Sequence, residues 1–142
     1  MKEIHTEIEI AASAQRVWEV LADFAKYGEW NPFIRQVRGE PREGAKLEIH
    51  ITTPAGTKRT YEPKVTKAEP GKELRWFGKV PGFLSGEHIF AIEDAGSGGR
   101  VKFIHREVFG GLLSSFFKDT DDVKAGFEEM NRALKARAEG QS

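Results

Sequence analysis

The sequence contains no cysteine among its 142 residues. Disulfide bridges, thiolate metal ligands and thiol nucleophiles are therefore excluded. A chain of this length can bury a core without such cross-links, and its size fits a single domain over residues 1–142. The lack of cysteine also fits a reducing compartment, so we expect a cytoplasmic protein.

Neither sign of charge is in excess, because 22 Lys and Arg residues balance 22 Asp and Glu residues. Nucleic-acid-binding domains carry a basic surplus, so no nucleic-acid partner is expected. No apolar run approaches the roughly 20 residues that a transmembrane helix needs. Residues 1–7 have no uninterrupted apolar stretch, which argues against a signal peptide. We therefore expect no transmembrane segment.

Most of the chain alternates between apolar and polar residues. In residues 3–10, isoleucines and a threonine alternate with Glu and His, which is typical of a half-buried strand. The alternation recurs from residue 34 to residue 109, where one face is apolar and the other charged. Turns rich in Gly or Pro interrupt it at residues 39–44, 53–56, 69–72, 81–86 and 96–99. The pattern predicts an antiparallel sheet of seven strands with one solvated face.

Helical patterns occur in two places. Ser13 can cap a helix over residues 14–25, and the Asn31-Pro32 pair then ends the helical region in a turn or a second short helix. A long closing helix is predicted from about Leu112 or Asp119 to Ala138. Its apolar stripe consists of Phe116, Val123, Phe127, Met130 and Leu134.

A sheet with one apolar face needs a cover, and the closing helix is the large element available for it. We therefore predict an α+β helix-grip fold. In it, a curved seven-stranded antiparallel sheet wraps the C-terminal helix, with one or two short helices between the first and second strands. Gly78 on the inward face and Gly126 in the helix remove side-chain volume, which favours an internal cavity. Gly126 could equally permit a kink or a close helix–sheet contact.

Three polar side chains fall on the inward face of the predicted sheet: His88, His105 and Glu107. Their burial requires partners, and a His–carboxylate pair could act as an acid/base or orient a ligand. A satisfied polar cluster without chemistry is the favoured interpretation, ahead of ligand orientation and of catalysis. No further motif supports a metal site, so we predict neither a metal nor a cofactor.

The predicted cavity wall combines these polar groups with apolar residues from several segments. Asn31 could hydrogen-bond a ligand or serve ordinary turn chemistry. A second apolar group, Phe83, Leu84, Phe116 and Phe117, is expected at one rim as a portal, a partner surface or local core. The predicted ligand contacts are Trp30, Asn31, Ile49, Tyr61, Trp76, His88, Phe90, Phe103, His105, Glu107, Phe127 and Met130.

Several segments together resemble the SRPBCC superfamily. They are the helix after the first strand, Trp30-Asn31-Pro32-Phe33, Gly86-Glu87-His88-Ile89-Phe90, residues 103–110 and the closing stretch from Gly126 to Arg137. The chain is most similar to the polyketide cyclase/dehydrase-like group of that superfamily, which also includes START lipid-binding domains. The resemblance implies a helix-grip fold and the binding of a hydrophobic small molecule.

Three functions remain as alternatives. The first is binding of a lipid, isoprenoid or aromatic polyketide-like molecule in the cavity, by a monomer or a homodimer. The second is a cyclase, dehydratase or isomerase that uses His88, His105 and Glu107 as acid/base groups. The third is a protein-interaction module resembling heat-shock-activator domains, through the apolar rim. Because the superfamily shares a cavity rather than a reaction, the prediction favours a binding protein over an enzyme.

Overall fold

The computed structural model of the protein describes residues 2–80, 84–96, 98–110 and 120–140, without the side chains of Lys2, Val80 and Leu84. The described part forms twelve elements, and every pairing between its strands is antiparallel. In chain order they are β1 (Lys2–Ile10), α1 (Ala14–Ala22), η1 (Phe24–Lys26), α2 (Tyr27–Trp30), β2 (Ile34–Arg38), β3 (Glu48–Thr52), β4 (Lys58–Tyr61), β5 (Lys64–Glu69), β6 (Glu73–Val80), β7 (Leu84–Asp94), β8 (Val101–Gly110) and α3 (Thr120–Ala138).

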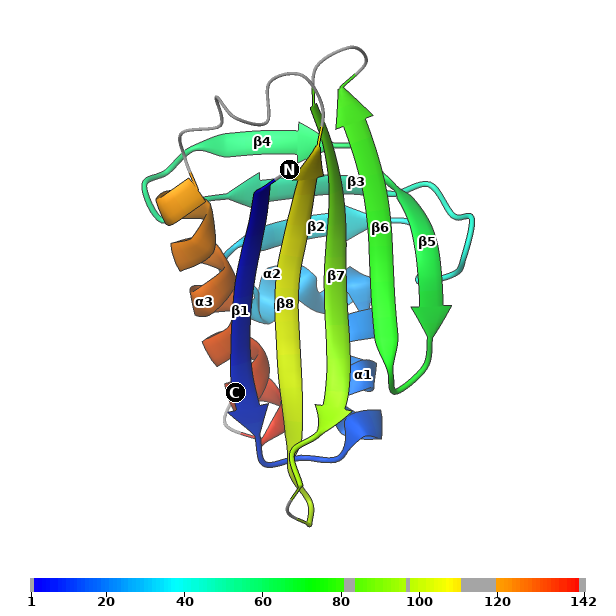
Figure 1. Ribbon diagram of the computed structural model, residues 1–142, viewed down its shortest axis with the longest axis vertical. Helices are drawn as coiled ribbons and strands as arrows, with labels where there is room; N and C mark the ends of the chain where they lie inside the picture. Colours follow the sequence, from blue (N-terminus) through cyan, green and yellow to red (C-terminus); the bar gives the residue numbers. More distant parts are fainter. Residues whose placement is uncertain (1, 81–83, 97, 111–119, 141–142) are drawn as a thin grey trace.

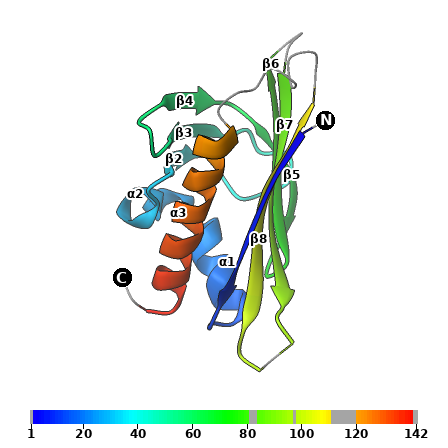
Figure 2. The ribbon, with the colours of Figure 1, turned by 60° about the vertical axis from the view of Figure 1, so that its left-hand side comes forward.

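The strands are arranged in two sheets. Five strands form one sheet in the order β1-β8-β7-β6-β5, and three form the other in the order β2-β3-β4. In Figure 1 the strands of the small sheet run across those of the large one. In Figure 2 the small sheet, α1 and α3 all lie on the same side of the large sheet. The predicted α+β helix-grip class is therefore confirmed, with one face of the large sheet covered.

The predicted count of seven strands is corrected at Pro63. Alternation through Tyr61, Pro63 and Val65 suggested one strand, but the chain there forms β4 and β5, which belong to different sheets. Proline has no N–H to donate to a ladder. Its carbonyl instead accepts a hydrogen bond of 2.8 Å from the Leu47 amide. The described part of the chain thus contains eight strands, and Pro63 lies where it passes between the sheets.

The helical region after β1 is divided into α1, η1 and α2, rather than the one or two helices predicted. Ser13 caps α1 as expected, because its hydroxyl accepts a hydrogen bond of 3.1 Å from the Arg16 amide. The helix ends at Ala22 instead of about Ala25, and Asp23 follows with φ −85° and ψ 73°, outside the helical basin. None of the helices in the described ranges has the length and apolarity needed to cross a bilayer.

Helix α3 packs against the core through the stripe that the sequence predicts. Val123, Phe127, Met130 and Leu134 are all buried, and the predicted start at Leu112 or Asp119 lies outside the described residues. A Cβ atom on Gly126 would overlap the ring of Phe33. Gly126 therefore permits a close contact with the segment before β2, which was one of the two interpretations open from sequence.

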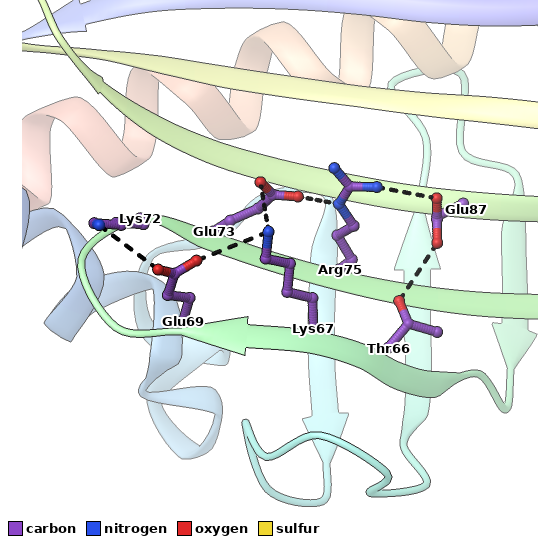
Figure 3. Close-up of polar contacts among 7 residues, drawn as sticks. All are labelled: Thr66, Lys67, Glu69, Lys72, Glu73, Arg75 and Glu87. Atoms are coloured by element: carbon purple, nitrogen blue, oxygen red, sulfur yellow. Dashed lines mark hydrogen bonds and ion pairs between the residues drawn. The ribbon is translucent and has the colours of Figure 1, made fainter.

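The outer face of β5, β6 and β7 carries a chain of ion pairs (Figure 3). Lys67 lies between two carboxylates, and Arg75 pairs with Glu73 and, at 3.5 Å, with Glu87. These groups remain in contact with solvent, where an ion pair contributes about 0–1 kcal/mol. The charged face predicted from the alternation is therefore the solvent side of the sheet, and the apolar face lies beneath the helices.

Candidate ligand-binding site

A cavity of about 340 Å³ lies between the two sheets. Small-molecule sites occupy about 300–1,000 Å³, so this volume is at the lower end of that range. Residues of β3 and β4 form one wall, and residues of β6, β7 and β8 form the other. The apolar part of the lining includes Ile34, Ile49, Ile51, Trp76 and Phe109.

The register of the large sheet places the polar groups of this lining. Glu107 on β8 is directly opposite His88 on β7. Two residues before His88 on β7, Gly86 is opposite Gly78 on β6. Both glycines line the cavity, and a Cβ atom on Gly86 would lie 2.6 Å from Glu107 Oε2. The missing side chain at Gly86 is therefore what leaves room for the carboxylate.

A buried hydrogen-bond network runs from His88 into the core. His88 Nε2 lies 2.7 Å from His105 Nε2, and His105 Nδ1 lies 2.9 Å from Asn131 Oδ1. Asn131 Nδ2 donates to Thr6 Oγ1 at 2.9 Å, and that hydroxyl donates to the His105 carbonyl at 2.8 Å. All four residues are buried. They come from β7, β8, α3 and β1, so the network ties the large sheet to the closing helix.

Burial keeps both histidines of the network neutral. Desolvation lowers the pKa of His88 well below its usual value, and the neighbouring His105 adds to the effect. Desolvation also lowers the pKa of His105 to about 3, against the opposing effect of its hydrogen bond to Asn131 Oδ1. The apolar surroundings include Phe127, whose ring stacks on His105 with centroids 3.9 Å apart. A positive charge on His88 or His105 is therefore disfavoured.

Glu107 lines the cavity beside His88. Its side chain keeps 21% of its surface, and Oε1 lies 3.7 Å from His88 Nδ1, which is too long for a hydrogen bond. Burial raises the pKa of Glu107 to about 7. The pKa of Tyr61, on the opposite wall, is also raised, by burial first and in smaller part by the charge of Glu107. A carboxyl that titrates near neutral pH can give or take a proton.

The structure brings some of the predicted ligand contacts to the cavity and leaves others in the core. Those that line it are Ile49, Tyr61, Trp76, His88 and Glu107. Five others are fully buried: Phe90, Phe103, His105, Phe127 and Met130. Of these, His105 reaches the cavity only through its hydrogen bond with His88.

Trp30 and Asn31 also lie away from the cavity lining. Trp30 is half-buried and packs on Tyr27, with ring centroids 5.2 Å apart. Asn31 is buried in the turn before β2, where its Oδ1 accepts hydrogen bonds of 2.9 and 2.8 Å from the amides of Phe33 and Ile34. The structure thus places Asn31 in the turn chemistry that was one of its two sequence interpretations.

Sequence reasoning missed Asn131 and Thr6 as members of the polar network. Asn131 follows Phe127 by four positions and precedes Leu134 by three, so the helical period does place it on the buried face. Thr6 stands on the apolar side of β1 between two isoleucines. A polar residue inside an apolar stripe was the available signal.

Two other sequence predictions bear on this region. The rim residues Phe83, Phe116 and Phe117 lie outside the described residues, and Leu84 contributes only its backbone, at the start of β7. No group of three or more His, Asp or Glu side chains within the described ranges is placed to hold a metal ion.

The two-sheet architecture, the closing helix and the cavity define a protein of the START-like helix-grip class. The chain belongs to the family described as polyketide cyclase / dehydrase and lipid transport, which matches residues 1–139. The resemblance noted in the sequence is thereby confirmed. A search of the curated proteins finds no match to the chain.

Solved structures with the same fold span nearly the whole chain. A START superfamily protein from Mycobacterium smegmatis has 19% identity and a TM-score of 0.75, with 99% of each chain covered. The Zhui aromatase/cyclase from Streptomyces sp. R1128 has 16% identity and a TM-score of 0.78, covering 97% of this chain and 93% of that one. The di-domain aromatase/cyclase StfQ of the steffimycin biosynthetic pathway has 15% identity and a TM-score of 0.67, covering 98% of this chain and 51% of that one. At these identities the likeness shows the fold alone.

Proposed function

We propose that the protein binds a small hydrophobic or amphipathic molecule in the cavity between its two sheets. The observation that carries the proposal is the lining, in which isoleucines and Trp76 lie beside the polar pair His88 and Glu107. Further polar residues of the lining are Thr60, Tyr61, Glu62, Lys79 and Ser85. An apolar pocket with a few convergent polar groups is the usual form of a small-molecule site. The family description, which includes lipid transport, supports the same function.

The size of the cavity restricts the ligand. Its volume of about 340 Å³ equals the share of liquid taken by on the order of ten water molecules, at about 30 Å³ each. One or two fused rings, or a short chain, match this volume. We therefore propose a compact aromatic, isoprenoid or short-chain ligand whose polar end lies beside Glu107.

Binding can be measured by titrating the protein with 1-naphthol and following its fluorescence. We expect saturable binding to the wild type and binding weakened about tenfold or more by Ile49→Phe, because the larger side chain fills the cavity. Ile104→Phe is the matched control, since Ile104 lies on the outer face of β8 and does not line the cavity. If the folded wild type bound no apolar probe, or Ile49→Phe bound as tightly, the proposal would fail.

A second candidate function is acid–base catalysis on a molecule held in the same cavity. It is favoured by one observation, the Glu107 carboxyl with a pKa of about 7 at the cavity surface. A carboxylate there can remove an α-proton from an enolisable ketone and return a proton to the same carbon. Cyclisation, dehydration and isomerisation reactions use such steps.

The catalytic candidate can be tested without knowing the natural substrate. In deuterated buffer, NMR would follow exchange of the α-protons of 2-tetralone, a bicyclic ketone of suitable size. We expect wild-type protein to accelerate the exchange and Glu107→Gln to lose the acceleration while still binding the ketone. Equal exchange rates with the two proteins would rule out Glu107 as the base.

A further inference from the structure

The buried network begins at a group that can only accept a hydrogen bond. The backbone carbonyl of His105 has no proton to give, so the Thr6 hydroxyl donates to it at 2.8 Å. Having used its proton there, Thr6 Oγ1 accepts from Asn131 at 2.9 Å. The amide nitrogen of Asn131 must therefore face Thr6, and its oxygen must face His105. The carbonyl thus fixes the orientation of the Asn131 side chain.

The same reasoning fixes the proton on each imidazole. Asn131 Oδ1 accepts, so the proton of His105 is on Nδ1, 2.9 Å away. A neutral imidazole carries one N–H, and His105 Nε2 is therefore an acceptor. His88 Nε2, 2.7 Å from it, must donate. His88 Nδ1 is then left with a lone pair and no proton.

This lone pair is available at the cavity surface. His88 lines the cavity, and among the hydrogen bonds of the described residues none uses His88 Nδ1 or the carboxylate of Glu107. The Glu107 oxygen 3.7 Å away is an acceptor as well when the group is ionised. When Glu107 is ionised, two acceptors therefore converge on one place in the wall. When Glu107 is protonated, His88 Nδ1 is still an acceptor that no donor of the network reaches.

We propose that the ligand carries a neutral hydrogen-bond donor, a phenolic or enolic hydroxyl, which His88 Nδ1 accepts. Asn131 and Thr6 are positioning residues that hold this acceptor in place through His105. The proposal rests on the proposed function, because it concerns the polar end of the same ligand. A ligand without the donor would desolvate the lone pair and leave it unpaired, and sites built for a hydrogen bond discriminate strongly against such ligands.

A neutral hydroxyl fits this place better than a charged ammonium group. Both imidazoles are buried and uncharged, and Phe127 and Trp76 surround them, with ring centroids 5.1 and 5.3 Å from His88. Burial in such surroundings disfavours a cation unless it is fully paired. The carboxyl opposite His88 in the sheet is that of Glu107, which burial disfavours in its charged form.

The positioning role can be tested on the protein without ligand. Long-range ¹H–¹⁵N NMR of the histidine rings distinguishes a protonated from an unprotonated ring nitrogen. We expect His105 to be protonated on Nδ1 and His88 on Nε2 in the wild type. Asn131→Asp keeps an acceptor oxygen beside His105 Nδ1, so both histidines should keep their tautomers. Asn131→Leu removes that oxygen, so the tautomers of His105 and His88 should change. Finding the His88 proton on Nδ1 in the wild type would overturn the proposal.

The donor requirement can be tested with two probes of similar size, 1-naphthol and 1-fluoronaphthalene. We expect wild-type protein to bind the naphthol at least about tenfold more tightly, and Asn131→Leu to bring the ratio of affinities close to one while Asn131→Asp preserves it. If Asn131→Leu does not fold, Thr6→Val interrupts the same network with a side chain of similar shape and should lower the ratio.

The outcomes separate the two proposals. Equal affinity of the wild type for both probes would overturn the donor requirement and leave the binding function intact. Failure of the wild type to bind either probe would overturn the binding function and the donor requirement together. An unchanged ratio in Asn131→Leu and Thr6→Val would overturn the positioning role of the network.

Discussion

At the scale of single residues, Glu107 depends on a neighbour that has no side chain. Its carboxylate occupies the space beside Gly86, where any Cβ atom would overlap it. The position takes the group largely out of bulk water without giving it a hydrogen-bond partner among the described residues, and this burial raises its pKa. The ionised form is therefore less stable in the folded protein than in the unfolded chain.

We expect Glu107→Gln to stabilise the protein more at pH 8 than at pH 5. In the unfolded chain this carboxyl has an ordinary pKa of 4.5, and in the folded protein about 7. Between these values the unfolded chain has lost the proton and the folded protein retains it, so wild-type stability falls as the pH rises through this window. The loss is complete above pH 7 and amounts to at most about 3 kcal/mol.

Urea unfolding of both proteins at the two pH values measures this effect. Burial lowers the pKa of His88 and of His105, so these residues make the protein more stable as the pH rises, the opposite direction. Both proteins contain the histidines, so their contribution cancels in the difference. A free-energy difference between variant and wild type that stays constant from pH 5 to pH 8 would contradict the prediction.

At the scale of elements, Gly126 determines how closely α3 approaches the segment before β2. Alanine in a helix interior is favoured over glycine by about 1 kcal/mol. At this position its Cβ would overlap the Phe33 ring, and overpacking a core costs about 1–3 kcal/mol. We expect Gly126→Ala to lower the unfolding free energy by about 1 kcal/mol, measured by urea denaturation.

Two variants control this measurement. Gly98→Ala places a methyl group where nothing lies within 4 Å and should leave the stability nearly unchanged. Phe33→Leu combined with Gly126→Ala should lose less stability than the sum of the two single changes, because the smaller side chain relieves the overlap. A Gly126→Ala protein as stable as the wild type would contradict the prediction and show that relieving the overlap costs no more than the about 1 kcal/mol by which alanine is favoured in a helix.

Local patterns predicted the elements better than the way they assemble. The period of two identified β1 and β6 to β8, and it placed His88 and His105 on the inward face. It failed between Tyr61 and Val65, because alternation is the same whether one strand continues or two strands join different sheets. Pro63 was the local clue, since it cannot donate to a ladder.

The candidate site was only half predictable for a similar reason. Titratable side chains on the apolar face of a predicted strand indicate a candidate site, so His88, His105 and Glu107 could be selected from the sequence. Asn131 is 125 residues from Thr6 along the chain, and their hydrogen bond depends on how α3 is packed against β1. No local pattern encodes that packing. The room for the Glu107 carboxylate likewise depends on Gly86, whose place beside Glu107 is a matter of strand register.

At the scale of the whole molecule, the two walls of the cavity differ in how firmly they are held. The wall from β7 and β8 lies in the interior of the five-stranded sheet. The opposite wall ends at β4, an edge strand of the small sheet whose four residues are all exposed. Segments with little burial open locally at low free-energy cost. The β4 side is therefore the wall expected to move when a ligand enters.

We expect backbone amides of β4 to exchange with deuterated solvent faster than those of β7 and β8. A ligand that contacts both walls ties β4 to the large sheet, so saturating 1-naphthol should slow exchange in β3 and β4 most. Hydrogen exchange followed by mass spectrometry, with and without the probe, measures this directly. The reference is β1, which pairs with β8 at the opposite edge of the large sheet and contributes no residue to the cavity lining. Equal slowing in β1 and β4 would mean that the ligand stabilises the fold as a whole and that β4 is not the mobile wall.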